Sequence, residues 1–336
     1  MDTLEIGERA APSHSAATTL AVCACTYKRP EGLRVLLGGL ERQTFESVHR
    51  PALHVVIADN EGSERARAIC EEFQSRSGIP LTYVHERERG ISFARNACLD
   101  HIPDGFDFFA FIDDDEIPED DWLEKLIAAQ AATGADVVQG PVIPVFDKTA
   151  PEWLRDGDFL GWPRRNWRGT RLNLAEFDEL PEAYTNNVLV RRARVAAIGL
   201  RFDPAYALTG GGDSAFFRAL HAGGARIVYG PRAVVTETVP PERANLWYRL
   251  RLEYRIALSP LAAKVKKKGT RKIHRRLKYA WRDSGPAKIT SGAGLFLGGL
   301  LRGKLNMDRT AVACIRMAYG AGQLARTLRM KYHIYR

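Results

Sequence analysis

The sequence predicts an α/β protein, with a mostly parallel central sheet flanked by helices, and three observations support this. Short apolar runs alternate with helical patterns at roughly 25 to 30 residues per unit, which is typical of β-α-β units. Apolar residues make up 45% and charged residues 26% of the 336-residue chain, an ordinary balance for a protein that buries a sizeable core. Polar residues follow several apolar runs, and open parallel sheets bind ligands beyond the carboxyl ends of their strands.

The elements follow in order along the chain. In the first half, strands are expected over residues 20–25, 53–58, 81–85 and 108–112, with a fifth starting at 137, and helices over 32–42, 63–76, 91–100 and 119–132. In the second half, the pattern predicts strands over 188–191, 226–228 and 233–237, helices over 193–198 and 213–222, and helices from 243 onward.

Periodicity is lost between residues 147 and 183, a segment that contains Trp153, Trp162 and Trp167. A loop of this length inside a compact domain is usually a lid or a binding loop. We therefore expect these tryptophans to present aromatic faces to a ligand.

Charge divides the chain near residue 240. Residues 1–240 contain 26 Lys+Arg and 36 Asp+Glu, whereas residues 241–336 contain 23 and 4. We therefore expect a flexible leader (1–18), a catalytic domain (19–242) and a basic helical C-terminal region (243–336). Such a basic region indicates an anionic partner, either a membrane surface or a nucleic acid.

The membrane is the favoured partner, since no nucleic-acid-binding fold is recognisable and no nucleic acid is expected. The apolar stretch 292–301 is shorter than the about 20 residues that span a bilayer. Short apolar patches bordered by Lys, Arg, Trp and Tyr fit helices that lie in an anionic membrane interface. The alternative is a helical subdomain that packs on the core or forms a dimer contact.

The five cysteines are widely spread and contain no CxxC pair. This pattern argues against a disulfide framework or a zinc site, and it favours a reducing compartment. No basic segment followed by an apolar run begins the chain, so no signal peptide is expected.

Three aspartates, Asp113, Asp114 and Asp115, follow the apolar run 108–112. Residues at i and i+2 at a strand end point the same way, so Asp113 and Asp115 are expected to approach one hard cation from one side. Mg²⁺ and Mn²⁺ are bound in this manner where water and phosphate oxygens complete the coordination. The alternative is a solvated acidic turn that caps the next helix.

Other candidates follow neighbouring strands. Thr26 and Tyr27 could hold a nucleobase through a hydroxyl and a ring face, or form a plain turn before Pro30. Asp59 could accept hydrogen bonds from a base or ribose, or cap the next helix. Arg95 could pair with an acidic cluster or a diphosphate, or be an ordinary surface arginine.

Asp213 follows three glycines and opens a helix. Glycines allow a ligand close to the backbone, and the helix dipole holds a carboxylate near the N-terminus ionised. An ionised aspartate that faces a cleft is a reasonable general base for an alcohol, although a plain helix cap is as compatible with this pattern.

Six motifs occur in a characteristic order: TYKRP, VVIADNE, GISFARN, FIDDDEIPEDDWL, YTNNVLVRR and GGGDSAFFRAL. Over about residues 18–258 the chain resembles family 2 glycosyltransferases of the GT-A fold, and especially bacterial enzymes of succinoglycan-type exopolysaccharide assembly. The resemblance implies an inverting transferase that uses a divalent metal and a nucleotide-diphosphate sugar, with a UDP-sugar favoured. It also implies a lipid-linked saccharide acceptor and a peripheral place on the cytoplasmic face of the bacterial inner membrane. On this interpretation Trp153, Trp162 and Trp167 would shape the acceptor side, since aromatic faces suit both sugar rings and apolar lipid.

The resemblance also assigns roles to residues. Asp213 matches the catalytic base, and Asp115 the metal ligand, with Glu237 in place of the histidine that the family often has there. Gly212 replaces a frequent glutamate. The donor would be held by Thr26, Tyr27, Arg29, Asp59, Glu61, Arg95, Asp113 and Asp114. Two alternatives remain open, a sugar nucleotidyltransferase and a degenerate binding protein of the same fold.

Overall fold

The computed structural model describes residues 18–151, 154, 174–258, 285–301 and 307–328. Trp153, Trp162 and Trp167 lie outside these described residues, as does nearly all of the predicted leader. The predictions for those segments therefore remain predictions.

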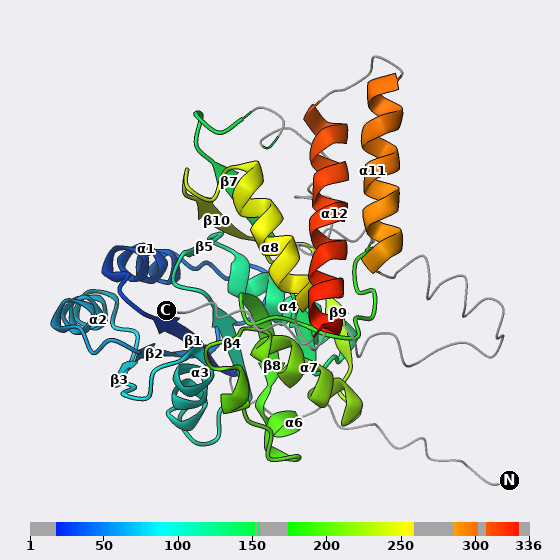
Figure 1. Cartoon of the computed structure of the whole chain (residues 1–336). Coiled ribbons are helices and arrows are strands. Elements are labelled where there is room, and N and C mark those ends of the chain that lie inside the picture. Colours follow the sequence, from blue (N-terminus) through cyan, green and yellow to red (C-terminus); the bar gives the residue numbers. More distant parts are fainter. Residues whose placement is uncertain (1–17, 152–153, 155–173, 259–284, 302–306, 329–336) are drawn as a thin grey trace, which may run out of the picture.

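A seven-stranded sheet forms the centre of the molecule, in the order β3-β2-β1-β4-β8-β6-β9 (Figure 1). Strands β3, β2, β1 and β4 run parallel, as the sequence predicts. Strand β8 is antiparallel to both of its neighbours, β4 and β6, so the sheet is mixed in its second half. The strands are β1 (Thr19–Thr26), β2 (Ala52–Asp59), β3 (Leu81–His85), β4 (Phe108–Ile112), β6 (Val137–Gln139), β8 (Asn187–Arg191) and β9 (Ile227–Tyr229).

Helices cover both faces of this sheet. One apolar cluster joins the strands to α1, α2 and α4, and a second joins them to α3 and α7. Because both faces are covered, β4 is buried at every position, which explains its uninterrupted apolar sequence. The helices of this part are α1 (Pro30–Glu41), α2 (Glu64–Ser77), α3 (Ile91–Asp100), α4 (Trp122–Thr133), α6 (Arg192–Ala196), η2 (Pro204–Tyr206) and α7 (Gly212–Ala222).

A second, three-stranded sheet stands beside the first. It contains β5 (Glu116–Pro118), β10 (Val235–Val239) and β7 (Val142–Phe146), with β10 in the middle. Strand β10 is antiparallel to β5 and pairs Glu237 with Glu116. The sequence analysis missed β5 and β7 and began the next helix at residue 119, whereas α4 begins at Trp122.

Three long helices follow the sheets: α8 (Leu246–Leu258), α11 (Gly285–Leu301) and α12 (Met307–Thr327). Helix α12 packs between α8 and α11, and the α11–α12 hairpin extends away from the sheet (Figure 1). Close approaches occur at glycines, where a Cβ on Gly292 would lie 2.7 Å from the Ala313 carbonyl oxygen. Of the helices that the structure describes, none has the length and apolarity to cross a membrane.

Candidate active site

The predicted donor residues of β1 and β4 meet at the carboxyl ends of these strands, because the two strands are neighbours in the sheet. The Thr26 hydroxyl donates to Asp114 Oδ2 over 2.8 Å. Arg29 Nη1 donates to Asp114 Oδ1 over 3.1 Å and to Asp115 Oδ2 over 2.6 Å. The β1–α1 turn is thus joined by direct hydrogen bonds to the turn formed by Asp113, Asp114 and Asp115, which we call the aspartate turn.

Close packing supports the same contact. A Cβ on Gly32 would lie only 2.4 Å from the Asp114 carbonyl oxygen, so α1 approaches the aspartate turn as closely as only glycine allows. The sequence analysis gave Gly32 no role.

The three aspartates do not continue the strand. Strand β4 ends at Ile112, and the chain turns, with the Asp113 N–H donating to Glu116 Oε2 over 2.9 Å. The alternation of an extended strand therefore does not apply to these residues, and the prediction that Asp113 and Asp115 approach one cation from one side stays a prediction. Asp115 contacts Arg29 and Arg243, whereas Asp113 interacts electrostatically with Arg95 and Asp213.

Burial governs protonation at this turn. It raises the pKa of Asp113 to about 7, with further upward contributions from Asp115, Asp114 and Asp213, while the Arg95 guanidinium opposes the rise. Burial also raises the pKa of Glu116 well above its ordinary value. Carboxylates crowded together away from water favour a cationic ligand, because a cation offsets their mutual repulsion.

Asp115 and Glu237 form the pair of carboxylates best placed for a metal. Arg243 Nη1 lies 3.8 Å from Asp115 Oδ2 and 3.6 Å from Glu237 Oε1, so one guanidinium contacts both. Burial, followed by the charge of Asp115, raises the pKa of Glu237. Within the described residues, no group of three or more His, Cys, Asp or Glu side chains is gathered around a common point.

This arrangement fits a metal that is shared with a substrate. Mg²⁺ and Mn²⁺ commonly take one or two carboxylates from a protein and complete their coordination with phosphate oxygens and water. Asp115 and Glu237 supply two hard oxygen donors of this kind from separate elements, the aspartate turn and β10.

Asp59 is engaged within the protein. Its buried carboxylate accepts hydrogen bonds from the backbone N–H groups of Glu61 and Ser63 and, over 2.7 Å, from the Tyr83 hydroxyl. Asp59 thus holds the turn that precedes α2, whose N-cap residue is Ser63, and it does not cap the helix itself. Glu61 is exposed, and its backbone is the part that contacts Asp59.

Asn60 is a residue that the sequence analysis did not single out. Its side-chain amide donates to the carbonyls of Glu86 and Glu88 and accepts from the Gly90 N–H over 2.7 Å. Asn60 therefore joins the end of β2 to the start of α3. Only the polar position after an apolar run hinted at this role.

Asp213 lies in the first turn of α7, and its charge reaches Asp113. Gly210 and Gly211 precede it with φ angles of 76° and 90°, a conformation that favours glycine. At Gly212 a Cβ would lie 3.2 Å from Tyr206 Cβ. A residue with a side chain at this position would require Tyr206 to shift by a few tenths of an ångström.

Two other predicted residues, Tyr27 and Arg95, lie in the β1–α1 turn and on α3. The Tyr27 ring is 41% exposed, with Lys28 Nζ 5.2 Å from its centroid. Lys28 has a φ of 58°, which is uncommon for a residue other than glycine. The Arg95 guanidinium lies 5.5 Å from the centroid of the Phe202 ring, within reach of Asp113 electrostatically.

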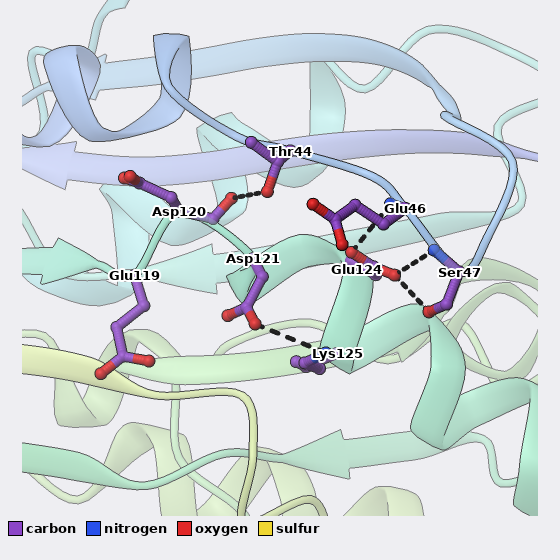
Figure 2. Close-up of a pocket in the computed structure, with 8 residues that line it drawn as sticks. All are labelled: Thr44, Glu46, Ser47, Glu119, Asp120, Asp121, Glu124 and Lys125. Carbon is purple, nitrogen blue, oxygen red and sulfur yellow. Dashed lines mark hydrogen bonds and ion pairs between the residues drawn. The ribbon is translucent and has the colours of Figure 1, made fainter.

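A separate hollow of about 580 Å³ lies where α1 ends and α4 begins (Figure 2). Five of its eight lining residues are acidic, and Lys125 forms an ion pair with Asp121. A carboxylate-lined hollow repels a diphosphate, so it does not suit a nucleotide-sugar. The lining residues are Thr44, Glu46, Ser47, Glu119, Asp120, Asp121, Glu124 and Lys125.

Comparison with known proteins decides the family. The model of glycosyl transferase family 2 matches residues 21–198, which include most of β1, all of β4 and the aspartate turn. The chain belongs to glycosyltransferase family 2. It is also 37% identical over 231 residues to the succinoglycan biosynthesis protein ExoM of Rhizobium meliloti, covering 69% of this chain and 70% of ExoM. A weaker relative, glycosyltransferase AglE of Haloferax volcanii, is 24% identical over 37% of this chain and 39% of its own.

Solved structures show the fold. The mannosyltransferase PcManGT of Pyrobaculum calidifontis, in complex with GDP-Man and Mn²⁺, aligns over 96% of this chain and 90% of its own with a TM-score of 0.64 and 18% identity. The 1–349 segment of S. aureus TarS, in complex with UDP-GlcNAc, aligns over 94% and 93% with a TM-score of 0.51 and 15% identity. This family 2 glycosyltransferase therefore has the predicted GT-A fold, and its likeness to a succinoglycan biosynthesis protein confirms the predicted resemblance.

Proposed function

We propose that this protein is an inverting, metal-dependent glycosyltransferase that moves a sugar from a nucleotide-diphosphate sugar to a lipid-linked saccharide. The observation that carries this proposal is the arrangement of charges after β4, where Arg243 contacts both Asp115 and Glu237. Asp113, beside Asp115, is in turn close enough to feel the charge of Asp213. Thr26 and Arg29 hold the aspartate turn beside the β1–α1 turn, where Tyr27 offers an exposed ring for a base.

In this proposal, the carboxylates that hold the metal and the carboxylate that acts as the base have different tasks. On one side, Asp115 and Glu237 would hold a divalent metal, which offsets charge on the departing diphosphate. On the other side, Asp213 takes the proton of the acceptor hydroxyl as its oxygen attacks the anomeric carbon. Attack from the face opposite the leaving group inverts the configuration at that carbon.

Two findings support a nucleotide-sugar donor. The structural relatives include complexes with GDP-Man and with UDP-GlcNAc. The aspartate turn follows the carboxyl end of β4, and open sheets of this kind bind ligands beyond the carboxyl ends of their strands. We favour a UDP-sugar. Asp59 would then support the base pocket by fixing the turn after β2, with Glu61 at its rim.

The catalytic proposal is tested with a panel of UDP-, GDP- and dTDP-sugars and membrane lipid extract as acceptor. We expect one donor to release its nucleoside diphosphate only when Mn²⁺ or Mg²⁺ is present, and the product to carry the inverted anomeric linkage in its NMR spectrum. A product with the donor's anomeric configuration would contradict the inverting mechanism. Turnover that EDTA leaves unchanged would contradict metal dependence.

The C-terminal region gives the proposed site of action. Helix α11 has 17 residues with Lys288 as its sole charged side chain, and Leu295 and Leu297 are 42% and 54% exposed. Exposed leucines in a strongly basic region suit the interface of an anionic membrane, where a lipid-linked acceptor is found. We therefore place the protein peripherally on the cytoplasmic face of the bacterial inner membrane.

Neither alternative is favoured by the structure. Gly212 lies against Tyr206, where any side chain would be in tight contact, and Glu237 lies close to Asp115, so Glu237 still offers a carboxylate in place of the family's histidine. The β1–α1 turn contains Tyr27, Lys28 and Arg29 in place of the glycine-rich loop that a nucleotidyltransferase needs for a triphosphate.

A further inference from the structure

We propose that Arg243 is an exchangeable counter-ion, which holds Asp115 and Glu237 together before the metal binds and then transfers to the donor diphosphate. This inference rests on the proposed metal-dependent function. Arg243 lies outside all six sequence motifs, between the end of β10 at Val239 and the start of α8 at Leu246.

The contacts of Arg243 occupy the place of a cation. Its Nη1 lies 3.6 Å from Glu237 and 3.8 Å from Asp115, so a single positive charge bridges the two carboxylates. A divalent metal that takes the same two carboxylates brings a second positive charge to this place. Because like charges repel at this distance, metal and guanidinium compete for the pair.

The two arginines that contact Asp115, Arg29 and Arg243, differ in how firmly they are held. Arg29 makes hydrogen bonds of 3.1 and 2.6 Å to Asp114 and Asp115, and these carboxylates raise its pKa. The distances of Arg243 to its two carboxylates exceed hydrogen-bond length. Arg29 is therefore a fixed part of the aspartate turn, whereas Arg243 can leave its carboxylates without breaking a hydrogen bond to them.

The position of Arg243 allows such an exchange. Its backbone is fixed, because the Arg243 N–H donates to the Pro240 carbonyl over 2.8 Å, while its side chain is 31% exposed. A change of side-chain rotamer therefore moves the guanidinium without moving the fold. A released guanidinium next to the metal finds a natural partner in the diphosphate, whose oxygens it can bind in a bidentate manner.

Binding measurements on the full chain test this proposal without relying on turnover. Mn²⁺ is titrated into wild type, Arg243→Gln and Arg243→Lys, first alone and then with UDP or GDP present. A matched control is Arg232→Gln, which removes an equal charge from an exposed pair with Glu176.

Without nucleotide, we expect Arg243→Gln to bind Mn²⁺ about 3 to 10 times more tightly than wild type, since a competing charge is gone. Arg243→Lys and Arg232→Gln should stay near wild type. With Mn²⁺ saturating, Arg243→Gln should bind the nucleoside diphosphate about 10 times more weakly, because its diphosphate contact is lost.

The outcomes separate this proposal from the function on which it rests. If Arg243→Gln bound Mn²⁺ no more tightly than wild type, or kept full affinity for the nucleoside diphosphate, the exchange would be wrong while metal dependence stood. If wild type bound no Mn²⁺ with or without nucleotide, the metal-dependent function and the exchange would both fall.

Discussion

At the scale of single residues, the aspartate turn is held by direct contacts with residues that are far away in the sequence. Thr26 and Arg29 reach Asp114 across more than 80 residues, and α1 touches the same turn at Gly32. The turn is thus held by hydrogen bonds from Thr26 and Arg29 and by tight packing against Gly32, and Asp115 also contacts Arg243.

Gly32 provides a test of this packing. We expect Gly32→Ala to lower the free energy of unfolding by about 1 to 3 kcal/mol and to weaken donor binding, since its Cβ would lie 2.4 Å from the Asp114 carbonyl. Gly38→Ala is the control in the same helix, because its Cβ has 3.7 Å of clearance; it should stabilise by about 0.5 to 1 kcal/mol. Urea unfolding that gave both variants the same sign would contradict this.

The raised pKa of Asp113 makes stability depend on pH. Folding raises this pKa from 3.8 to about 7, so the folded protein holds the proton more tightly than the unfolded chain. The associated stability is complete below pH 3.8 and is lost as the pH rises through 7. Asp113→Asn removes this loss.

We therefore expect metal-free Asp113→Asn to melt at least about 3 °C above wild type at pH 8, with a smaller difference at pH 5. Asp104→Asn, at a fully exposed position, should show no such trend. Thermal melts in EDTA would refute the account if the Asp113→Asn difference were the same at both pH values.

The sequence predicted these residues unequally, and the reasons are physical. Thr26, Arg29 and the aspartates were found because polar residues after buried strands converge in a parallel sheet. Asn60 and Arg243 were missed because their roles depend on partners that folding brings from other elements. The turn formed by Asp113–Asp115 could not be predicted either, although the strand before it was, because it is held by contacts with Arg29 and Gly32 from another part of the chain.

At the scale of elements, a strand could be predicted only where its apolar pattern is long enough to be recognised in the sequence. Long buried strands such as β1 and β4 stand out as apolar runs, and both were predicted. Strand β5 has three residues, too few for any period, and it exists because β10 pairs with it from more than 110 residues away. The carboxylate pair of Asp115 and Glu237 depends on that pairing.

The α11–α12 hairpin offers a test at this scale. Gly292→Leu should expose the amides of both helices to hydrogen exchange, because its side chain would meet the Ala313 carbonyl oxygen and Met317 at 2.7 Å. Gly294→Leu is the control in the same helix, since nothing lies within 4 Å of its Cβ. Exchange rates that matched between the two variants would show that the hairpin is not held by this contact.

At the scale of the whole molecule, charge and apolar surface are divided between two parts. The acidic catalytic part carries the site, and the basic C-terminal part carries exposed leucines on α11. On the proposed membrane-bound function, this division would orient the molecule at an anionic surface, with electrostatic attraction and apolar insertion acting together.

Vesicle flotation tests the membrane contact. The double variant Leu295→Ser, Leu297→Ser should bind phosphatidylglycerol vesicles about 10 times more weakly than wild type, because two exposed apolar side chains are lost. Val35→Ser, at a 48% exposed position on α1, is the control and should bind as wild type does. Equal binding by the double variant, or full binding to neutral vesicles at high salt, would contradict an anionic membrane partner.

The central claim is that Asp115 and Glu237 hold the metal while Asp213 acts as the catalytic base, and Asp213→Asn tests this most directly. The measurement compares donor affinity in the presence of Mn²⁺ with the rate of transfer to acceptor, in wild type and in this variant. We predict unchanged affinity and a turnover about 10² to 10⁴ times slower, because the variant binds the donor but cannot take the acceptor proton. Turnover that survived at the wild-type rate would show that Asp213 is not the base.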